Sequence, residues 1–320
     1  MCIKRQAWGT STHQVPSDVA TTAFVTMALI RDSGIHGTHR SAIEKGVDHV
    51  LLAIETAPDD SPRLRTPDGT QIQYKLGQLV DTHMASLLLG EVYGKMGGSR
   101  HARIQKAYAR VLSKVQLAQQ ADGSFDANGW APVLSTSIAS QGLYKAVDNG
   151  VAVDQSVLDR ADAYSNAQVS ESGEADASDG AGVALYGVAS ALAGNKQASG
   201  RSASPSAARA ETKARAMSET IASDSSGALI QGFGSMGGEE MLSYMLISDT
   251  LAEDGGKAFT QWDQKIGAHL LNIQNRDGSW VGHHCITSAV FVTAGALATL
   301  AAGDSAHART REAKVRGDRG

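Results

Sequence analysis

The stretch Gln119-Gln120-Ala121-Asp122-Gly123-Ser124-Phe125 recurs later in the chain as Gln274-Asn275-Arg276-Asp277-Gly278-Ser279-Trp280. Each copy ends one amphipathic stretch and comes before a segment of small and apolar residues. A phrase that returns at the same place in a helical unit is typical of a repeat architecture. We therefore interpret the chain as a series of related helical units.

Apolar residues recur at helical spacing along most of the chain, and strand-like alternation is nearly absent outside one loop. The periodic segments are of two kinds. Nearly uncharged segments rich in small residues span residues 18–31, 80–93, 131–147, 179–194, 238–252 and 284–301. Amphipathic segments with one charged face span residues 39–56, 101–119, 154–168, 206–222 and 257–274. The sequence therefore predicts an all-α protein.

The two kinds of segment predict two layers of helices. A helix that is apolar around most of its circumference must be covered on all sides, whereas an amphipathic helix needs cover on only one. Strict alternation of inner and outer helices is what a closed ring of helical hairpins, an α/α toroid, would produce. The predicted ring is α6/α6-like but lacks one outer helix. Its inner helices would all run in the same direction.

We expect one domain over residues 1–302, with three segments that do not belong to the two layers. Residues 57–79 contain three prolines, and long irregular connections of this kind are often lids over an opening. Residues 195–205 are rich in Ser, Gly and Ala, which predicts a flexible linker. Residues 303–320 are charged and lack an apolar period, which predicts a disordered tail.

The composition excludes several classes of partner. The chain has 29 Lys and Arg residues against 33 Asp and Glu residues, so no global field favours nucleic acid or an anionic membrane. The sequence contains no run of ~18 apolar residues, so we expect no transmembrane segment. The N-terminus lacks the apolar core of a secretory signal. With only two cysteines, no disulfide framework is expected. These features predict a cytoplasmic protein; they leave the oligomeric state open.

The two repeated phrases, each followed by a helix of small residues, resemble the prenyltransferase and squalene-cyclase repeat. The likeness covers most of the chain, and residues 129–134 and 282–287 further resemble bacterial members of this group. The resemblance implies an α6/α6 toroid around a central cavity. It also implies that the cavity holds a small apolar or isoprenoid-like ligand, or a peptide.

The activities known in this group make different demands on the sequence. Class II terpene cyclases need an Asp-x-Asp-Asp motif and a cavity lined with aromatic rings. This chain has no such motif and only 5% aromatic residues, so we do not expect a squalene or hopene cyclase. Protein prenyltransferase β subunits bind zinc through an Asp-x-Cys pair and a His on the next inner helix. Here a Glu could replace the Asp, Met241 stands where the Cys should be, and His283 and His284 supply the His.

Parallel inner helices would place all their N-termini at one end of the ring, where polar residues could converge. The polar or aromatic residues at these starts are Asp18, Asp81, His83, Trp130, Asp176, Asp179, Glu239, Glu240, His283, His284 and Cys285. A helix N-terminus favours carboxylates, neutral imidazole and thiolate. We expect the catalytic residues to be Glu239, Glu240, His283, His284 and Cys285. We expect zinc or another divalent metal to bind Glu240, His284, His83 and Asp81.

Each of these residues also has a structural interpretation. Asp18, Asp81 and Asp179 stand where Asp is a preferred helix cap, Cys285 and His83 could be buried core residues, and Trp130 could pack between repeats. Three hypotheses for function stay open at this point. The first is an enzyme resembling a metal-assisted transferase or a cyclase, with the metal as Lewis acid or activator of water. The second is a non-catalytic lipid- or peptide-binding toroid, and the third is an assembly scaffold.

Overall fold

The computed structural model describes residues 17–125, 128–170, 172–175, 182–201, 205–232 and 236–317. Within these ranges every named element is a helix, and one isolated bridge pairs Val169 with Ala175. The prediction of an all-α protein is therefore confirmed. None of the described helices combines the length and the hydropathy that crossing a bilayer requires.

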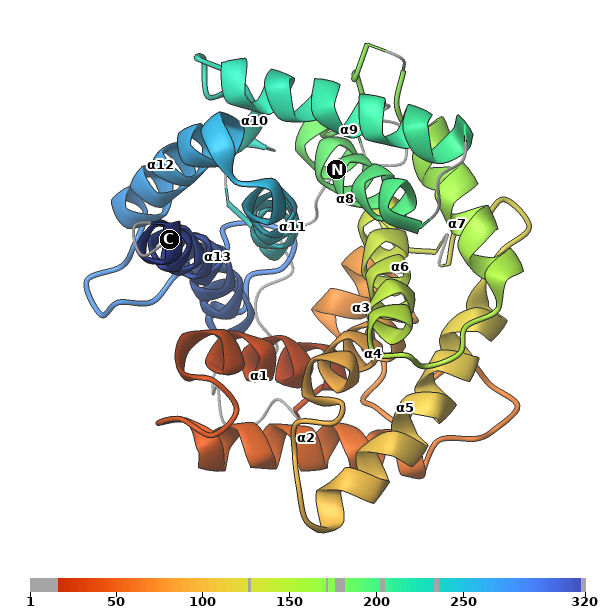
Figure 1. The fold of residues 1–320 in the computed structure, drawn as a ribbon. Helices are drawn as coiled ribbons and strands as arrows, with labels where there is room; N and C mark the ends of the chain where they lie inside the picture. Colours follow the sequence, from red (N-terminus) through yellow and green to blue (C-terminus); the bar gives the residue numbers. More distant parts are fainter. Residues whose placement is uncertain are drawn as a thin grey trace.

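Six helices form an inner layer (Figure 1). They are α1 (Val19–Ser33), α4 (Val80–Val92), α6 (Pro132–Asp148), α8 (Ala184–Arg201), α11 (Gly238–Asp254) and α13 (Ala289–Gly317). Each packs against the next, and α13 packs against α1, so the contacts run around a closed cycle. Small residues permit this close packing: a Cβ on Gly142 of α6 would lie 2.1 Å from Ser86 Oγ of α4.

Five amphipathic helices surround the inner layer (Figure 1). They are α2 (Arg40–Glu55), α5 (Ser99–Ala118), α7 (Gln155–Ala167), α9 (Pro205–Ser223) and α12 (Gly256–Asn272). Their apolar faces pack on inner helices: α2 on α1, α5 on α4, α7 and α9 on α8, and α12 on α11. Two short helices, α3 (Gln71–Leu76) and α10 (Ala228–Gln231), lie in connections that lead from outer to inner helices.

The repeated phrase forms the same turn in both copies. Gln120 N–H donates to Ser124 O at 2.7 Å, and Asn275 N–H donates to Ser279 O at 2.9 Å. In each copy the Asp accepts from the backbone N–H of the following Ser, at 3.0 Å. The backbone N–H of the aromatic residue then donates to a Thr hydroxyl on the next inner helix, Thr136 or Thr293. The phrase thus ties the end of an outer helix to the inner helix that follows it.

A third copy of this turn follows α7 and was missed in the sequence. Ser170 N–H donates to Glu174 O at 3.0 Å and Gly173 N–H to Ser170 O at 3.1 Å. Gly173 has φ +84°, like Gly123 at +94° and Gly278 at +85°, a conformation that glycine adopts without a steric cost. Because the Asp-Gly pair is absent from this copy, only the backbone preserves the repeat.

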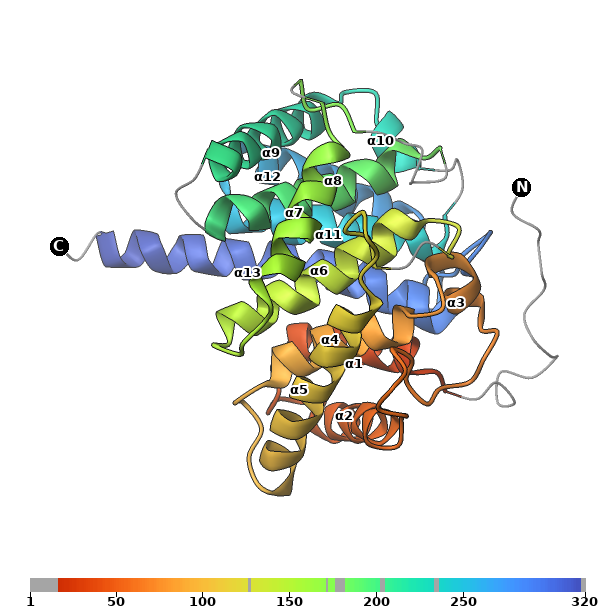
Figure 2. The ribbon, with the colours of Figure 1, turned by 90° about the vertical axis from the view of Figure 1, so that its right-hand side faces the viewer.

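Two of the predicted irregular segments are helical instead. Most of the expected linker belongs to the end of α8, where Asn195 and Ala198 are buried and Arg201 pairs with Asp159 and Asp162. These tertiary contacts override the Ser and Gly content of the segment. Helix α13 continues through Gly317, away from the body of the molecule (Figure 2), into the segment expected to be a disordered tail. Residues 303–317 contain three Ala and three Arg residues, and both residue types are strong helix formers.

The segment 57–79, predicted to be a lid, is fixed to the body at several points. Lys114 Nζ of α5 donates to the carbonyl oxygens of Pro58 and Ser61. Thr82 Oγ1 of α4 donates to Pro62 O at 2.8 Å. Helix α3 within the segment lies at the end of the ring opposite to the tip of α13 (Figure 2). The segment therefore helps to close this end of the ring.

Candidate functional site

The start of α11 meets the connection that leads into α13. His284 Nε2 lies 3.5 Å from Glu240 Oε1. Ile286 N–H donates to Glu239 Oε2 at 3.4 Å. The adjacent residues Glu239 and Glu240 thus lie close to His284, which is distant in the sequence. We call this location the glutamate cluster and define it as Glu239, Glu240, His284 and Tyr186, whose contact is described below.

Backbone pairing holds the two segments of the cluster together. Gly238 N–H donates to Ile286 O at 3.0 Å, and His283 N–H donates to Met236 O at 2.7 Å. A Cβ on Gly238 would lie 2.7 Å from Ile286 Cβ, so this close approach requires glycine. The pairing also keeps His283, His284 and Cys285 out of helix α13, which begins only at Ala289.

Tyr186 completes the cluster and was missed in the sequence. Its hydroxyl, on the inner helix α8, donates to Glu240 Oε1 at 2.7 Å. Gly237 N–H donates to the other oxygen of Glu240 at 2.9 Å. Burial and the negative charge of Glu240 raise the pKa of Tyr186, so its hydroxyl keeps its proton as a donor. No sequence signal distinguished this Tyr from the core aromatic residues.

Glu239 is the unusual member of the cluster. Its side chain is fully buried, and its Oε1 atom has no hydrogen-bond partner. Burial, followed by the charge of Glu240, raises the pKa of Glu239 to about 8. Two adjacent buried carboxyl groups favour one neutral and one charged form. Glu239 therefore carries a proton at neutral pH.

Lys75 of α3 supplies the nearest positive field, and it too was missed in the sequence. Its charge opposes the upward shift of the Glu239 pKa. Burial lowers the pKa of Lys75, while Glu239 opposes that shift. The ammonium lies 5.3 Å from the Trp130 ring centre and 5.2 Å from that of Tyr74, a cation–π arrangement. Segment 57–79 thus brings a cation toward the glutamate cluster.

The structure does not assemble the predicted metal site. Asp81 accepts from Ala20 N–H and Gln73 Nε2, both at 2.8 Å, so it anchors α1 and α3; burial raises its pKa to about 6. His83 Nδ1 lies 3.1 Å from Ser135 Oγ, and burial lowers its pKa to about 3. Within the described residues, no three His, Cys, Asp or Glu side chains form a group that could hold a metal ion.

The other predicted site residues have different places. Cys285 is disulfide-bonded, so the expected thiolate is wrong; Cys2, the only other cysteine in the sequence, lies outside the described residues. Cys285 has φ +52°, a strained backbone for a residue with a side chain. His283 is exposed. Asp18 caps α1 by accepting from Thr21 N–H at 2.6 Å.

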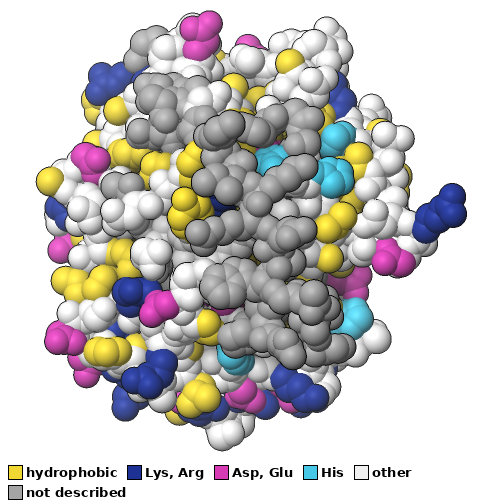
Figure 3. All heavy atoms as spheres, turned by 180° about the vertical axis from the view of Figure 1, so that it is seen from behind, with side chains coloured by type: hydrophobic (Ala, Val, Ile, Leu, Met, Phe, Trp, Pro, Cys, Tyr) yellow, Lys and Arg dark blue, Asp and Glu magenta, His cyan; other side chains and the backbone are white. Residues whose placement is uncertain are grey.

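Three further residues complete the account of the predicted rim. Trp130 is half-buried and packs against the core. Asp176 and Asp179 lie outside the described residues. Over the described part of the face seen in Figure 3, acidic and basic side chains are interspersed and form no large patch of one sign.

A cavity of about 1100 Å³ opens at the other end of the ring, where the inner helices end. Asp249 and Glu253 of α11 line it. Glu239 lies on the same face of α11 as Leu242, Leu246, Asp249 and Glu253, because each of these residues follows the previous one by three or four positions. Glu239 lies ~15 Å deeper than Asp249 at 1.5 Å per residue, with buried Leu242 and Leu246 between them. The glutamate cluster is therefore at the closed end of the axis.

Tyr186→Phe should lower the free energy of unfolding by about 1–3 kcal/mol, because a buried carboxylate loses a donor. The measurement is urea denaturation at pH 7. Tyr93→Phe is the matched control, since within the described residues the Tyr93 ring packs on Tyr108 and its hydroxyl makes no hydrogen bond. Equal stabilities of the two variants would show that the Tyr186 contact with Glu240 contributes nothing.

Comparisons with known proteins leave the family open: no family model and no curated protein sequence matches this chain. Its function must therefore be argued from the site itself.

Proposed function

We propose that this chain is an α/α toroid of the prenyltransferase and squalene-cyclase repeat type, and an enzyme in which Glu239 is a general acid. Its substrate would be an apolar, isoprenoid-like alkene. The observation that carries the proposal is a fully buried Glu239 with a pKa raised to about 8 and an oxygen without a hydrogen-bond partner.

The contacts of the glutamate cluster support a division of roles between the two carboxyl groups. Glu240 is held by Tyr186 and by Gly237 N–H, so its oxygens are already occupied by donors. Glu239 accepts one long hydrogen bond from Ile286 N–H and leaves Oε1 without a partner. A pair of titratable groups with different environments is typical of an acid and its positioning neighbour.

The proposed reaction needs no second reactant. The π electrons of the alkene form a new C–H bond with the Glu239 proton, which leaves a carbocation and a Glu239 carboxylate. Loss of a different proton from the neighbouring carbon returns a proton to Glu239 and forms a new double bond. The net result is isomerisation, or cyclisation if a second double bond attacks the cation first. The carboxyl group of Glu240 would stabilise the cation electrostatically.

The donor set does not suit zinc in the arrangement that the structure shows. Glu240 and His284 are two potential ligands, whereas structural and catalytic zinc sites use three or four protein ligands. The hydrogen bonds of Tyr186 and Gly237 engage both oxygens of Glu240. We therefore build no step of the proposal on a metal.

The test is deuterium incorporation. The protein is incubated in heavy water with squalene or geranylgeraniol, and the recovered lipid is analysed by mass spectrometry. We expect deuterium at carbon with the wild-type protein and at least ~100-fold less with Glu239→Gln, the usual loss when a general acid is removed. Glu219→Gln, an exposed position on α9, should retain the wild-type level. Equal incorporation by wild type and Glu239→Gln would refute the role of Glu239.

The second candidate is a binding toroid without turnover, and one observation favours it. All four side chains of the glutamate cluster are at least 90% buried, so the cluster could serve only to join α8, α11 and the connection before α13. In that case neither protein would introduce deuterium, and Glu239→Gln would affect stability alone.

A further inference from the structure

We propose that the cavity at the open end of the ring binds an amphiphilic organic cation, an ammonium group on an apolar body. The proposal does not depend on the glutamate cluster, which lies at the closed end. The cavity volume of about 1100 Å³ slightly exceeds the usual range of ~300–1,000 Å³ for small-molecule sites. A whole ligand can therefore enter.

The charges that line the cavity are unequal. Six acidic side chains line it, Glu91, Asp148, Asp159, Asp162, Asp249 and Glu253, against four basic ones, Arg31, Lys145, Lys196 and Arg201. Every basic group already has an acidic partner: Asp249, Glu91, Asp254, and Asp159 with Asp162, respectively. Within the described residues, Asp148 and Glu253 form no ion pair, although the charge of Lys196 acts on Glu253. The cavity thus offers two carboxylates to a cation.

The ends of the helices add to this negative potential. Asp148 is the last residue of α6, and Glu253 is the last but one of α11. The C-terminus of a helix carries about half a negative charge, and residues in the last turns of α4, α6, α8 and α11 line the cavity. The pKa of Glu253 is raised by burial and by its acidic neighbours Asp249, Asp254 and Asp148, against the charge of Lys196. A bound cation would relieve this repulsion.

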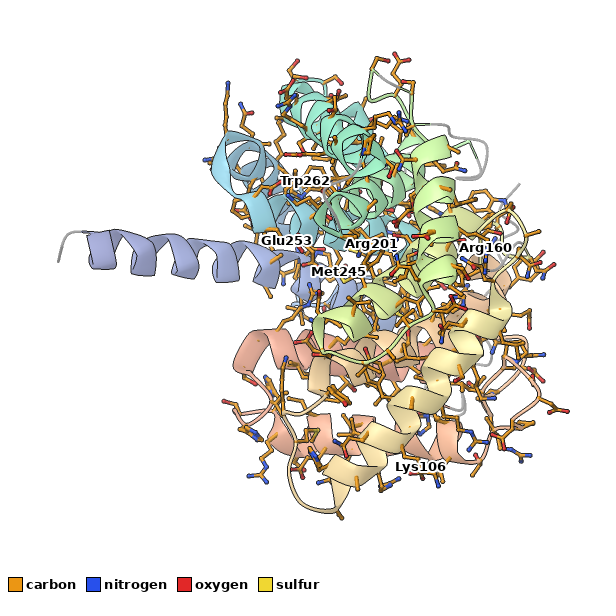
Figure 4. The ribbon with its side chains drawn as sticks, turned by 45° about the vertical axis from the view of Figure 1, so that its right-hand side comes forward. Lys106, Arg160, Arg201, Met245, Glu253 and Trp262 are labelled. Atoms are coloured by element: carbon orange, nitrogen blue, oxygen red, sulfur yellow. The ribbon has the colours of Figure 1, made fainter. Side chains whose placement is uncertain are left out.

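The remaining lining specifies the rest of the ligand. Met27, Leu87, Leu158 and Met245 provide apolar surface, and methionine adapts to ligands of different shape. Gln197 also lines the cavity, and its side-chain carbonyl accepts no hydrogen bond. Figure 4 shows Met245, Glu253 and Arg201 near the centre of the ring, whereas Lys106 and Arg160 lie on outer helices. Acceptors beside an apolar wall fit a donor-rich head on an apolar body.

The experiment compares three ligands that share one body: phenylbutylamine, phenylbutanol and phenylbutyrate. Isothermal titration calorimetry measures their affinity for the full chain. We expect the amine to bind at least tenfold more tightly than the alcohol or the acid. Binding of phenylbutyrate as tight as that of the amine, or no binding of the amine, would overturn the proposal.

Variants assign the binding to the cavity. Glu253→Gln should weaken binding of the amine about tenfold, the cost of losing one charged hydrogen bond. Asp148→Asn should weaken it in the same direction and serves as the second variant if Glu253→Gln fails to fold. Glu219→Gln, on the exposed face of α9, is the matched control and should bind as the wild type does. Unchanged affinity in both cavity variants would contradict the assignment. Because Glu239→Gln leaves the cavity intact, failure of the acid proposal would not alter these results.

Discussion

Glu239→Gln is expected to stabilise the protein at pH 9 by on the order of 4 kcal/mol and to change stability little at pH 5. The folded state holds the Glu239 proton up to a pKa of about 8, against an ordinary glutamate pKa of 4.5. The folded state therefore binds more protons, and its stability is lost as pH rises from about 4.5 to about 8. Glutamine is neutral at every pH and avoids this loss. The magnitude follows from about 1.4 kcal/mol for each unit of the pKa difference.

Urea denaturation of both proteins at pH 5, 7 and 9 measures this effect. The difference in the free energy of unfolding between the two proteins reports the effect of Glu239 alone, because Asp81 and other buried groups titrate in both. Glu219→Gln should parallel the wild type over the whole range. If wild type and Glu239→Gln showed the same dependence of stability on pH, Glu239 would not be a protonated acid in the folded state.

Trp280→Ala is expected to lower the free energy of unfolding by about 3–5 kcal/mol, the usual cost of removing a buried aromatic side chain. Trp280 is 2% exposed, and its indole N–H donates to Leu270 O at the end of α12 at 2.8 Å. Its backbone N–H reaches Thr293 on α13. The residue therefore joins an outer helix to the next inner helix.

The same denaturation experiment tests this role of the repeated phrase. Leu271→Ala is the control, because Leu271 is a large apolar residue of α12 that is 66% exposed. It should cost less than about 1 kcal/mol. A similarly small cost for Trp280→Ala would mean that the repeated phrase does not hold the helices together.

The helices could be predicted because their apolar periods are long and their kinds alternate. Gly142 and Gly295 show why small residues mark the inner helices: a Cβ on either would collide with a neighbouring inner helix. Where the apolar period gives way to Ser, Gly or charged residues, as in 195–201 and 303–317, composition alone predicted no helix. Burial of Ala198 and the pairing of Arg201 determine the first of these segments.

The site could be predicted in part. Glu239, Glu240 and His284 were expected to meet because parallel inner helices start at one end of a ring. Tyr186 and Lys75 could not be predicted, since the hydrogen bond of Tyr186 and the charge interaction of Lys75 with Glu239 leave no period or motif in the sequence. Asp81 and His83, expected as metal ligands, instead contact neighbours in the fold, Gln73 and Ser135, and these contacts leave no pattern in the sequence. The sequence also does not reveal that the buried residues Leu242 and Leu246 lie between Glu239 and the cavity.

The most direct test of the account is infrared difference spectroscopy of wild type minus Glu239→Gln, titrated from pH 5 to pH 10. We predict a carbonyl band of a protonated carboxylic acid that is present at pH 7, disappears with a midpoint near pH 8, and is missing from the variant. A wild-type protein whose Glu239 band is already absent at pH 6 would contradict the account.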